Sequence, residues 1–164
     1  MPTVMSWPEW ARHDAVSLAS LVRQGQVTPA ELAAQVADGI AMLNPMLNAV
    51  IEVFGDMVDD PQEDGTRPEG PFCGVPCLMQ DLGPTIQGRR QELGARLMAG
   101  HVAAHDSFLT TRIRAAGLNI LGRTSASEFG VATSAENPRV GVTRNPWNLD
   151  YTSGGSSAGS GAIV

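Results

Sequence analysis

The chain has 164 residues, of which 43% are hydrophobic and 17% charged, proportions typical of a folded globular protein rather than a disordered one. Seventeen acidic residues against eleven basic ones give a net charge of -6, which disfavours binding to nucleic acids or anionic membranes. No segment approaches a membrane span, and the amino terminus lacks the pattern of a secretory signal. We therefore expect a cytoplasmic protein whose residues 1–164 form one domain.

The two cysteines, Cys73 and Cys77, lie in the apolar run FCGVPCLM. If this run is extended, their α carbons are too far apart for a disulfide, so both are expected to be reduced thiols, as in cytoplasmic proteins. A metal-binding pair is the alternative, but no second cluster of ligands accompanies it.

The first elements expected are two helices that form a hairpin over residues 14–44. Asp14 is placed to cap the first helix, which Gly25 ends. The run Thr28–Glu31 is a capping box with proline at the first helical position, and an apolar face continues until Asn44-Pro45 stops the second helix.

Strands and helices then alternate, as in a layered α/β sheet. The composition of residues 48–54 and 118–121 predicts strands, and that of residues 59–70 predicts a surface loop. Residues 74–79 are apolar without alternation, which is typical of a buried strand in a largely parallel sheet. This strand ends at Gln80-Asp81.

The remaining segments are loops, one further helix and turns. Residues 82–100 are rich in glycine and proline and are expected to be loops, whereas Asp106 or Ser107 can cap the helix that follows. Ser125–Glu128 has the form of another capping box, and turns are expected at 137–138, 141 and 145–146.

The glycine- and serine-rich run over residues 153–161 is the most informative segment. A flexible linker is one interpretation, but the run passes into apolar residues 162–164, which resemble the start of a helix. A phosphate-binding loop would need the Walker lysine or a GxGxxG pattern, and neither is present. The remaining interpretation is a loop whose glycines let the backbone approach a ligand while hydroxyls point into a cavity.

This run, with the preceding TRNPWNL segment at 143–149, resembles the amidase signature of a family of amide-hydrolysing enzymes. The run 74–81 resembles that family's Gly-(hydrophobic)-Pro to Lys-Asp strand, and 114–128 its next helix, strand and loop. The resemblance covers nearly the whole chain and implies the amino-terminal portion of an α/β fold with a layered mixed sheet flanked by helices. Within the family, amidases acting on aminohexanoate amides are the subgroup most similar.

The resemblance implies hydrolysis of carbon–nitrogen bonds in a small-molecule amide through a serine acyl-enzyme, without metal or organic cofactor. In the family, a neutral lysine and a second serine in a cis peptide activate the nucleophile. Ser156 matches the cis-serine and Ser157 the supporting serine, and Gly154 and Gly155 belong to the same loop. Ala158, where the family usually has glycine, is a milder departure.

Gln80 stands where the family has its catalytic lysine, and a glutamine amide does not exchange protons near neutral pH. All eleven basic residues are arginines, which cannot replace that base. The family's nucleophile lies downstream of the glycine–serine loop, so we expect these 164 residues to be inactive alone and to associate with themselves or with a missing carboxyl-terminal segment. A non-catalytic amidase-like module that binds a ligand or partner is the alternative.

Other polar residues are given structural interpretations. His101 and His105 have an i, i+4 spacing that could hold a metal on a helix, but they precede the helix cap and lack an adjacent glutamate. No metal site is therefore expected. Asp81 and Glu128 match acidic positions of the family, and we expect them to cap or hydrogen-bond loops beneath the site rather than transfer protons.

Overall fold

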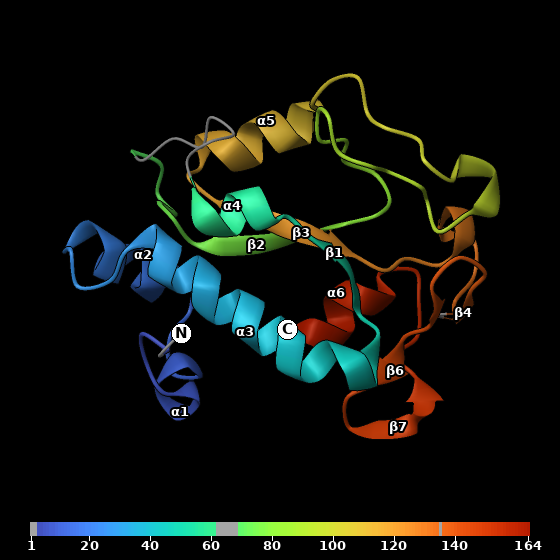
Figure 1. The fold of residues 1–164 in the computed structure, drawn as a ribbon, viewed down its shortest axis with the longest axis horizontal. Coiled ribbons are helices and arrows are strands. Elements are labelled where there is room, and N and C mark those ends of the chain that lie inside the picture. Colours follow the sequence, from blue (N-terminus) through green and yellow to red (C-terminus); the bar gives the residue numbers. More distant parts are fainter. Residues whose placement is uncertain (1–2, 62–68, 135) are drawn as a thin grey trace. The chain divides into compact units, whose positions relative to one another are not determined.

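The computed structural model describes residues 3–61, 69–134 and 136–164, which divide into two compact units. The first unit comprises residues 1–39, 54–77 and 112–121, and the second comprises 40–53, 78–111 and 122–164, so several elements contribute to both. The chain order of the elements is visible in Figure 1.

The amino-terminal helices begin where the sequence predicts. Helix α1 (Trp7–Trp10) precedes α2 (Ala15–Arg23), whose first turn donates the Ser17 N–H to the Asp14 carboxylate at 2.8 Å. Gly25, with φ of +67°, follows α2 in the left-handed conformation expected of a helix-ending glycine. Both predictions are confirmed.

Helix α3 (Pro29–Leu47) starts with the predicted capping box but ends later than predicted. Glu31 accepts the Thr28 N–H at 2.8 Å, while Thr28 Oγ1 accepts the Glu31 N–H at 3.2 Å. The predicted stop at Asn44-Pro45 is wrong. Pro45 lies within α3, and the helix closes one turn later through the Asn48 N–H to Asn44 carbonyl bond of 2.8 Å, since a proline removes only its own donor.

The first unit has an apolar core between its helices and the start of the second strand. The buried side chains of this core are those of Met5, Leu18, Ala19, Val27, Leu32 and Val75. Gln35 is also buried, and its amide exchanges two hydrogen bonds with the Met5 main chain, so its polar atoms are satisfied. Helix α4 (Gly55–Asp59), which the sequence did not predict, belongs to this unit.

The main sheet has three strands in the order β1-β3-β2. Strand β1 (Val50–Val53) pairs antiparallel with β3 (Asn119–Thr124), and the two are labelled next to each other in Figure 1. On the other side of β3 lies β2 (Pro76–Gln80). The Asn119 N–H donates to the Val75 carbonyl and the Asp81 N–H to the Thr124 carbonyl, so residue numbers increase in the same direction along both strands, as in a parallel pair. The predicted mixed α/β sheet is confirmed.

Details of the sheet differ from the sequence prediction. Strand β3 is fully buried and longer than predicted, whereas β2 is mostly half-buried rather than buried. Of the predicted loop at 59–70, residues 62–68 lie outside the described part of the chain. Cys73 is buried and Cys77 half-buried, and neither takes part in a disulfide among the described residues.

The remaining elements are short. Residues 82–100 are loops except for the 3-10 turn η1 (Arg96–Met98), and α5 (Phe108–Ala115) is capped by Ser107, whose hydroxyl accepts the Thr110 N–H at 3.2 Å. The predicted capping box at 125–128 is wrong: Ser125 instead bonds the Thr143 hydroxyl, and a 3-10 turn, η2 (Glu128–Gly130), follows.

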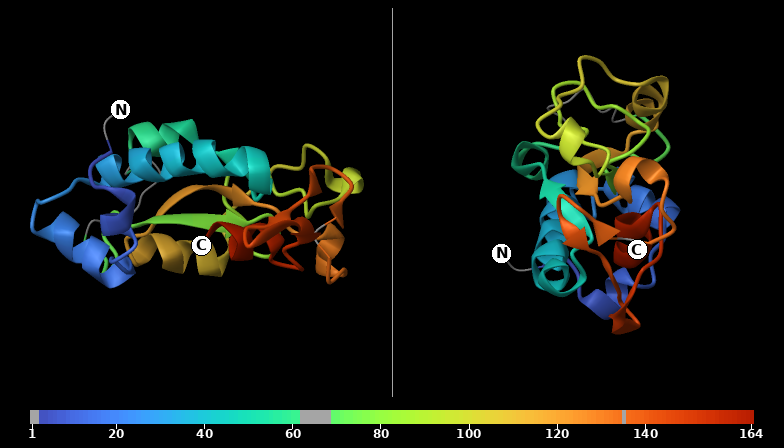
Figure 2. Two further views of the ribbon diagram at one scale, coloured as in Figure 1. Left: turned by 90° about the horizontal axis from the view of Figure 1, so that it is seen from below. Right: turned by 90° about the vertical axis from the view of Figure 1, so that its right-hand side faces the viewer.

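Two small antiparallel hairpins and a helix complete the second unit. Strand β4 (Glu136–Asn137) pairs with β5 (Gly141–Val142), and β6 (Arg144–Asn145) pairs with β7 (Asn148–Thr152). A helix is present where the run was expected to lead into one, but α6 (Ala158–Ile163) begins four residues before the predicted start at 162, and Figure 2 shows it close to the β6–β7 hairpin. None of the described helices has the length and apolar character needed to cross a membrane.

Candidate active site

Gln80 is the last residue of β2, and the main chain around it is anchored to β3. The Asp81 N–H donates to the Thr124 carbonyl at 3.0 Å, which holds the end of β2 against the end of β3. The Gln80 side chain is half-buried. The backbone at Gln80, the residue that the resemblance matches to the family's lysine, is therefore held in place by its pairing with β3.

The glycine–serine loop lies between β7 and α6 and requires its glycines. Gly154 has φ of +83°, in the region that favours glycine. A methyl group on Gly155 would lie 2.8 Å from the Ala132 carbonyl oxygen and 3.0 Å from that of Ser134, so a larger residue would not fit. The peptide bond between Gly155 and Ser156 is cis, as the family resemblance implies.

The Gln80 side chain contacts this loop at two points. The Ser157 hydroxyl donates to Gln80 Oε1 at 2.7 Å, and Gln80 Nε2 donates to the Ser156 carbonyl oxygen at 3.2 Å. The same carbonyl accepts the Ser127 N–H at 3.2 Å. The residues that the resemblance matches to the family's lysine and serines, 76 or more positions apart in the sequence, thus meet in one place.

The partner of the Gln80 carbonyl oxygen is a detail that sequence reasoning missed. The resemblance pairs residue 80 with Ser156, whereas the hydroxyl in contact is that of the exposed Ser157, and Ser156 contributes its main chain. Within the described residues the Ser156 hydroxyl, which is half-buried, forms no hydrogen bond. A glutamine oxygen can accept the Ser157 proton in a hydrogen bond but cannot remove it near neutral pH.

A buried set of hydroxyl groups supports the loop from beneath. The Ser125 and Thr143 hydroxyls are 2.5 Å apart, and Thr143 donates to the Asn48 carbonyl at 2.8 Å. The Thr124 and Ser160 hydroxyls are 2.7 Å apart and link the end of β3 to α6. No sequence motif predicted these pairs, because each joins residues at least 18 positions apart.

Asp81 has the structural role that the sequence indicated. Its side chain is 2% exposed, and its carboxylate accepts the N–H groups of Glu92 at 2.8 Å and Gly94 at 3.2 Å. Arg123 Nη1 donates to the same carboxylate at 2.7 Å. All of these bonds hold the loop that follows Gln80 in place, as expected of a structural role.

Glu92 is a second buried carboxylate in this cluster and stays ionised. Burial opposes its charge, but the Gly100 N–H bond and the guanidinium groups of Arg123 and Arg139 outweigh that effect and hold the pKa of Glu92 below its ordinary value. Arg139 pairs with the Glu92 carboxylate at 2.9 Å. The sequence did not single out Arg123, Arg139 or Glu92, since a charged residue next to a strand carries no local signal of its distant partner.

Glu128, His101 and His105 do not join the site's hydrogen bonds. All three are exposed, and Glu128 lies in the first turn of η2. Over residues 3–61, 69–134 and 136–164, no group of three or more histidine, cysteine or carboxylate residues is arranged to hold a metal ion.

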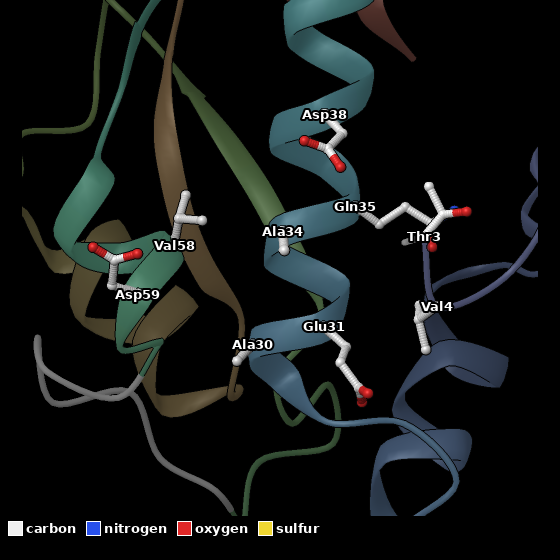
Figure 3. Close-up of a pocket in the computed structure, with 9 residues that line it drawn as sticks. All are labelled: Thr3, Val4, Ala30, Glu31, Ala34, Gln35, Asp38, Val58 and Asp59. Carbon is white, nitrogen blue, oxygen red and sulfur yellow. The ribbon is translucent and has the colours of Figure 1, made fainter. Parts of the chain in front are cut away.

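The first unit contains a separate pocket that involves none of the family motifs. Figure 3 shows the Glu31, Asp38 and Asp59 carboxylates around it, on α3 and α4. Glu31 already serves the capping box of α3. The pocket therefore presents acidic groups on α3 and α4, apart from the motifs that resemble the family's site.

Comparisons with known proteins identify the family of the chain. A family model described as Amidase matches residues 31–164. The chain is 40% identical over 151 residues to a Mycobacterium tuberculosis protein named AmiC, covering 92% of this chain and 32% of that protein. It is 39% identical over 153 residues to the 6-aminohexanoate-cyclic-dimer hydrolase of Paenarthrobacter ureafaciens, covering 92% of this chain and 30% of the relative.

Solved structures share the fold. The 6-aminohexanoate cyclic dimer hydrolase complexed with substrate superposes with a TM-score of 0.85 at 38% identity, over 93% of this chain and 31% of that one. A bacterial aryl acylamidase of the amidase signature family superposes with a TM-score of 0.82 at 30% identity, over 93% and 33% of the two chains. The chain thus spans about a third of the length of the relatives it matches. With its signature loop, its mixed sheet and these matches, the chain belongs to the amidase family.

Proposed function

We propose that this chain provides the residue-80 strand and the glycine–serine loop of a hydrolase that cleaves carbon–nitrogen bonds in small-molecule amides through a serine acyl-enzyme. The observation that carries the proposal is that the end of β2 lies against the glycine–serine loop, so that the two segments resembling the family's catalytic motifs meet. The similarity to a 6-aminohexanoate cyclic dimer hydrolase and to an aryl acylamidase supports this class of substrate. The proposed chemistry uses side chains and main-chain donors, without metal or organic cofactor.

We further propose that the 164 residues do not turn over amides by themselves. A serine hydroxyl becomes a good nucleophile only when a base removes its proton, and general acid–base assistance of this kind contributes roughly 10²–10⁴-fold. The Gln80 amide accepts a hydrogen bond from Ser157 but cannot take the proton. The sequence contains no lysine that could replace it.

A non-catalytic binding module is the second candidate, and the double contact of Gln80 favours it. Gln80 uses its carbonyl oxygen toward Ser157 and one N–H toward Ser156, which leaves its second N–H as a donor for a ligand. A neutral amide or carboxylic acid offers the matching acceptor. Such a module would bind an amide without cleaving it.

One experiment separates the two candidates. The chain is joined after Val164 to the portion of the 6-aminohexanoate-cyclic-dimer hydrolase that follows its corresponding loop, with Gln80 or with Gln80→Lys. Turnover of 6-aminohexanoate cyclic dimer and of a simple anilide is measured, together with labelling by a fluorophosphonate probe. Gln87→Lys is the matched control, because Gln87 is exposed and its replacement adds a lysine elsewhere in the second unit.

Each outcome assigns the function. Turnover with Gln80→Lys alone supports the hydrolase proposal and the inactivity of the glutamine form. Turnover with Gln80, or labelling and turnover by the 164-residue chain, contradicts our account of the base. Binding of amide by the glutamine form, without turnover by any lysine form, favours the binding module.

Self-association, or pairing with a missing carboxyl-terminal segment, is part of the proposal. An apolar groove in the second unit is lined by Leu43, Met46, Trp147, Leu149 and Val164, and the Trp147 side chain is 94% exposed. Exposed apolar area of this kind favours association. Sedimentation of the chain tests it, and a monodisperse monomer that unfolds cooperatively would count against it. A cytoplasmic location, in which Cys73 and Cys77 stay reduced, is also proposed.

A further inference from the structure

A cluster of charged side chains in the second unit centres on Arg123 and includes Asp81, the residue that follows Gln80. The Arg123 side chain is 5% exposed, although it projects from a strand, and arginine is rarely buried without partners. Its guanidinium contacts three carboxylates from three segments: Glu52 of β1 at 2.7 Å, Asp81 after β2 at 2.7 Å and Glu92 of the following loop at 3.3 Å. A planar fork of five donors can serve several carboxylates at once, as a lysine ammonium cannot.

The contact with Asp81 is the one that reaches the candidate site. Asp81 is held by its main chain, through the 3.0 Å bond to the Thr124 carbonyl, and by its side chain, through Arg123. Both anchors belong to adjacent residues of β3. Arg123 and Thr124 together therefore hold the backbone at residue 81, and with it the position of the Gln80 side chain.

The other half of the site is attached to the same strand. Beyond β3, the Ser127 N–H donates to the Ser156 carbonyl, which also accepts from Gln80 Nε2. The Thr124 hydroxyl meets that of Ser160 in α6. Arg123 thus ties Gln80 to the segment that carries its partners in the glycine–serine loop.

We propose that Arg123 is a positioning residue of the candidate site, which through its ion pair with Asp81 holds the Gln80 amide in contact with Ser156 and Ser157. The inference deepens the proposed function, because it concerns the same site. It does not depend on turnover, since it predicts the geometry of one side chain. Failure of the positioning role and failure of the hydrolase proposal therefore give different results.

The test measures the chemical shifts of the Gln80 side-chain amide by ¹⁵N-resolved NMR of the 164-residue chain. The Nε2 pair of Gln80 is assigned as the signal that disappears in Gln80→Met. In the unaltered chain the two Nε2 protons should be well separated in chemical shift, because one of them bonds to the Ser156 carbonyl. Arg123→Gln should collapse this separation to the value seen for the exposed Gln87.

Arg139→Gln is the matched control. It removes one guanidinium from the same cluster, where Arg139 pairs with Glu92 and not with Asp81. The control variant should lose stability yet keep the Gln80 signal unchanged. A merely structural role of Arg123 would instead make the two variants behave alike.

A second variant covers the case in which Arg123→Gln does not fold. Asp81→Asn breaks the same ion pair from the other end, while Arg123 keeps Glu52 and Glu92 as partners. It should show the same collapse of the Gln80 signal. Folded Arg123→Gln or Asp81→Asn with an unchanged signal would overturn the proposal, and failure of both variants to fold would assign Arg123 to the stability of the fold alone.

Discussion

Substitution of Gly159 by alanine tests how tightly α6 packs behind the glycine–serine loop. Gly159 donates its N–H to the Ser125 carbonyl at 3.1 Å, and the Ser125 N–H donates to the Ala49 carbonyl at 2.8 Å. A methyl group on Gly159 would lie 2.5 Å from the Ser125 nitrogen, 2.8 Å from the Ser125 hydroxyl oxygen, and closer still to the Ala49 carbonyl oxygen. Two of these atoms belong to the backbone and cannot rotate away.

The expected cost follows from three effects. Overpacking of a tight site costs about 1–3 kcal/mol, and weakening the two backbone hydrogen bonds costs about 0.5–1.5 kcal/mol each. Replacing a helical glycine by alanine returns about 1 kcal/mol. Gly159→Ala should therefore lower the free energy of unfolding by about 1–5 kcal/mol.

Gly161 provides the matched control in the same helix. A methyl group there would meet no atom within 4 Å, so Gly161→Ala gains the helix propensity without the clash and should stabilise by about 0.5–1 kcal/mol. Urea unfolding followed by circular dichroism measures both variants, and amide exchange of the Ser125 N–H reports local loosening. Equal stability of the two variants, with unchanged exchange at Ser125, would refute the packing argument.

Three further predictions concern stability. Because the pKa of Glu92 is lowered in the folded protein, its carboxylate stabilises the fold fully at pH values above the ordinary pKa of 4.5. This contribution is lost as the pH falls through the lower pKa of the folded state. The urea midpoint of Glu92→Gln should therefore fall less on acidification than that of the unaltered chain. Leu32→Ala, at a fully buried position of the first unit, should cost about 2–5 kcal/mol in urea unfolding, whereas Val16→Ala, at a 59% exposed position, should stay within about 0.5 kcal/mol. Ser107→Ala removes the cap that accepts the Thr110 N–H and should cost about 0.5–2 kcal/mol, measured in the same way; an unchanged midpoint would contradict the capping role.

Local hydrogen bonding explains which parts of the fold could be predicted. The Asp14 cap and the Thr28–Glu31 capping box join residues three positions apart, so the sequence alone contains both partners. One local pattern failed because a distant group competed: Ser125 turns to Thr143 instead of capping η2. The predicted stop at Pro45 failed for another reason, since the proline removes only its own donor and α3 continues to Leu47.

Some features of the candidate site could likewise be predicted from the sequence, whereas others depend on contacts between distant residues. The sequence by itself determined the family and the glycines of the signature loop, and it predicted that Gln80 stands at the family's lysine position, because each is a matter of residue type at a fixed spacing. Only the tertiary structure decided that Gln80 meets the Ser157 hydroxyl rather than that of Ser156, and that Arg123 gathers Glu52, Asp81 and Glu92. These contacts join residues between 31 and 77 positions apart, and their geometry depends on how β1, β2 and β3 are paired, which no local pattern encodes.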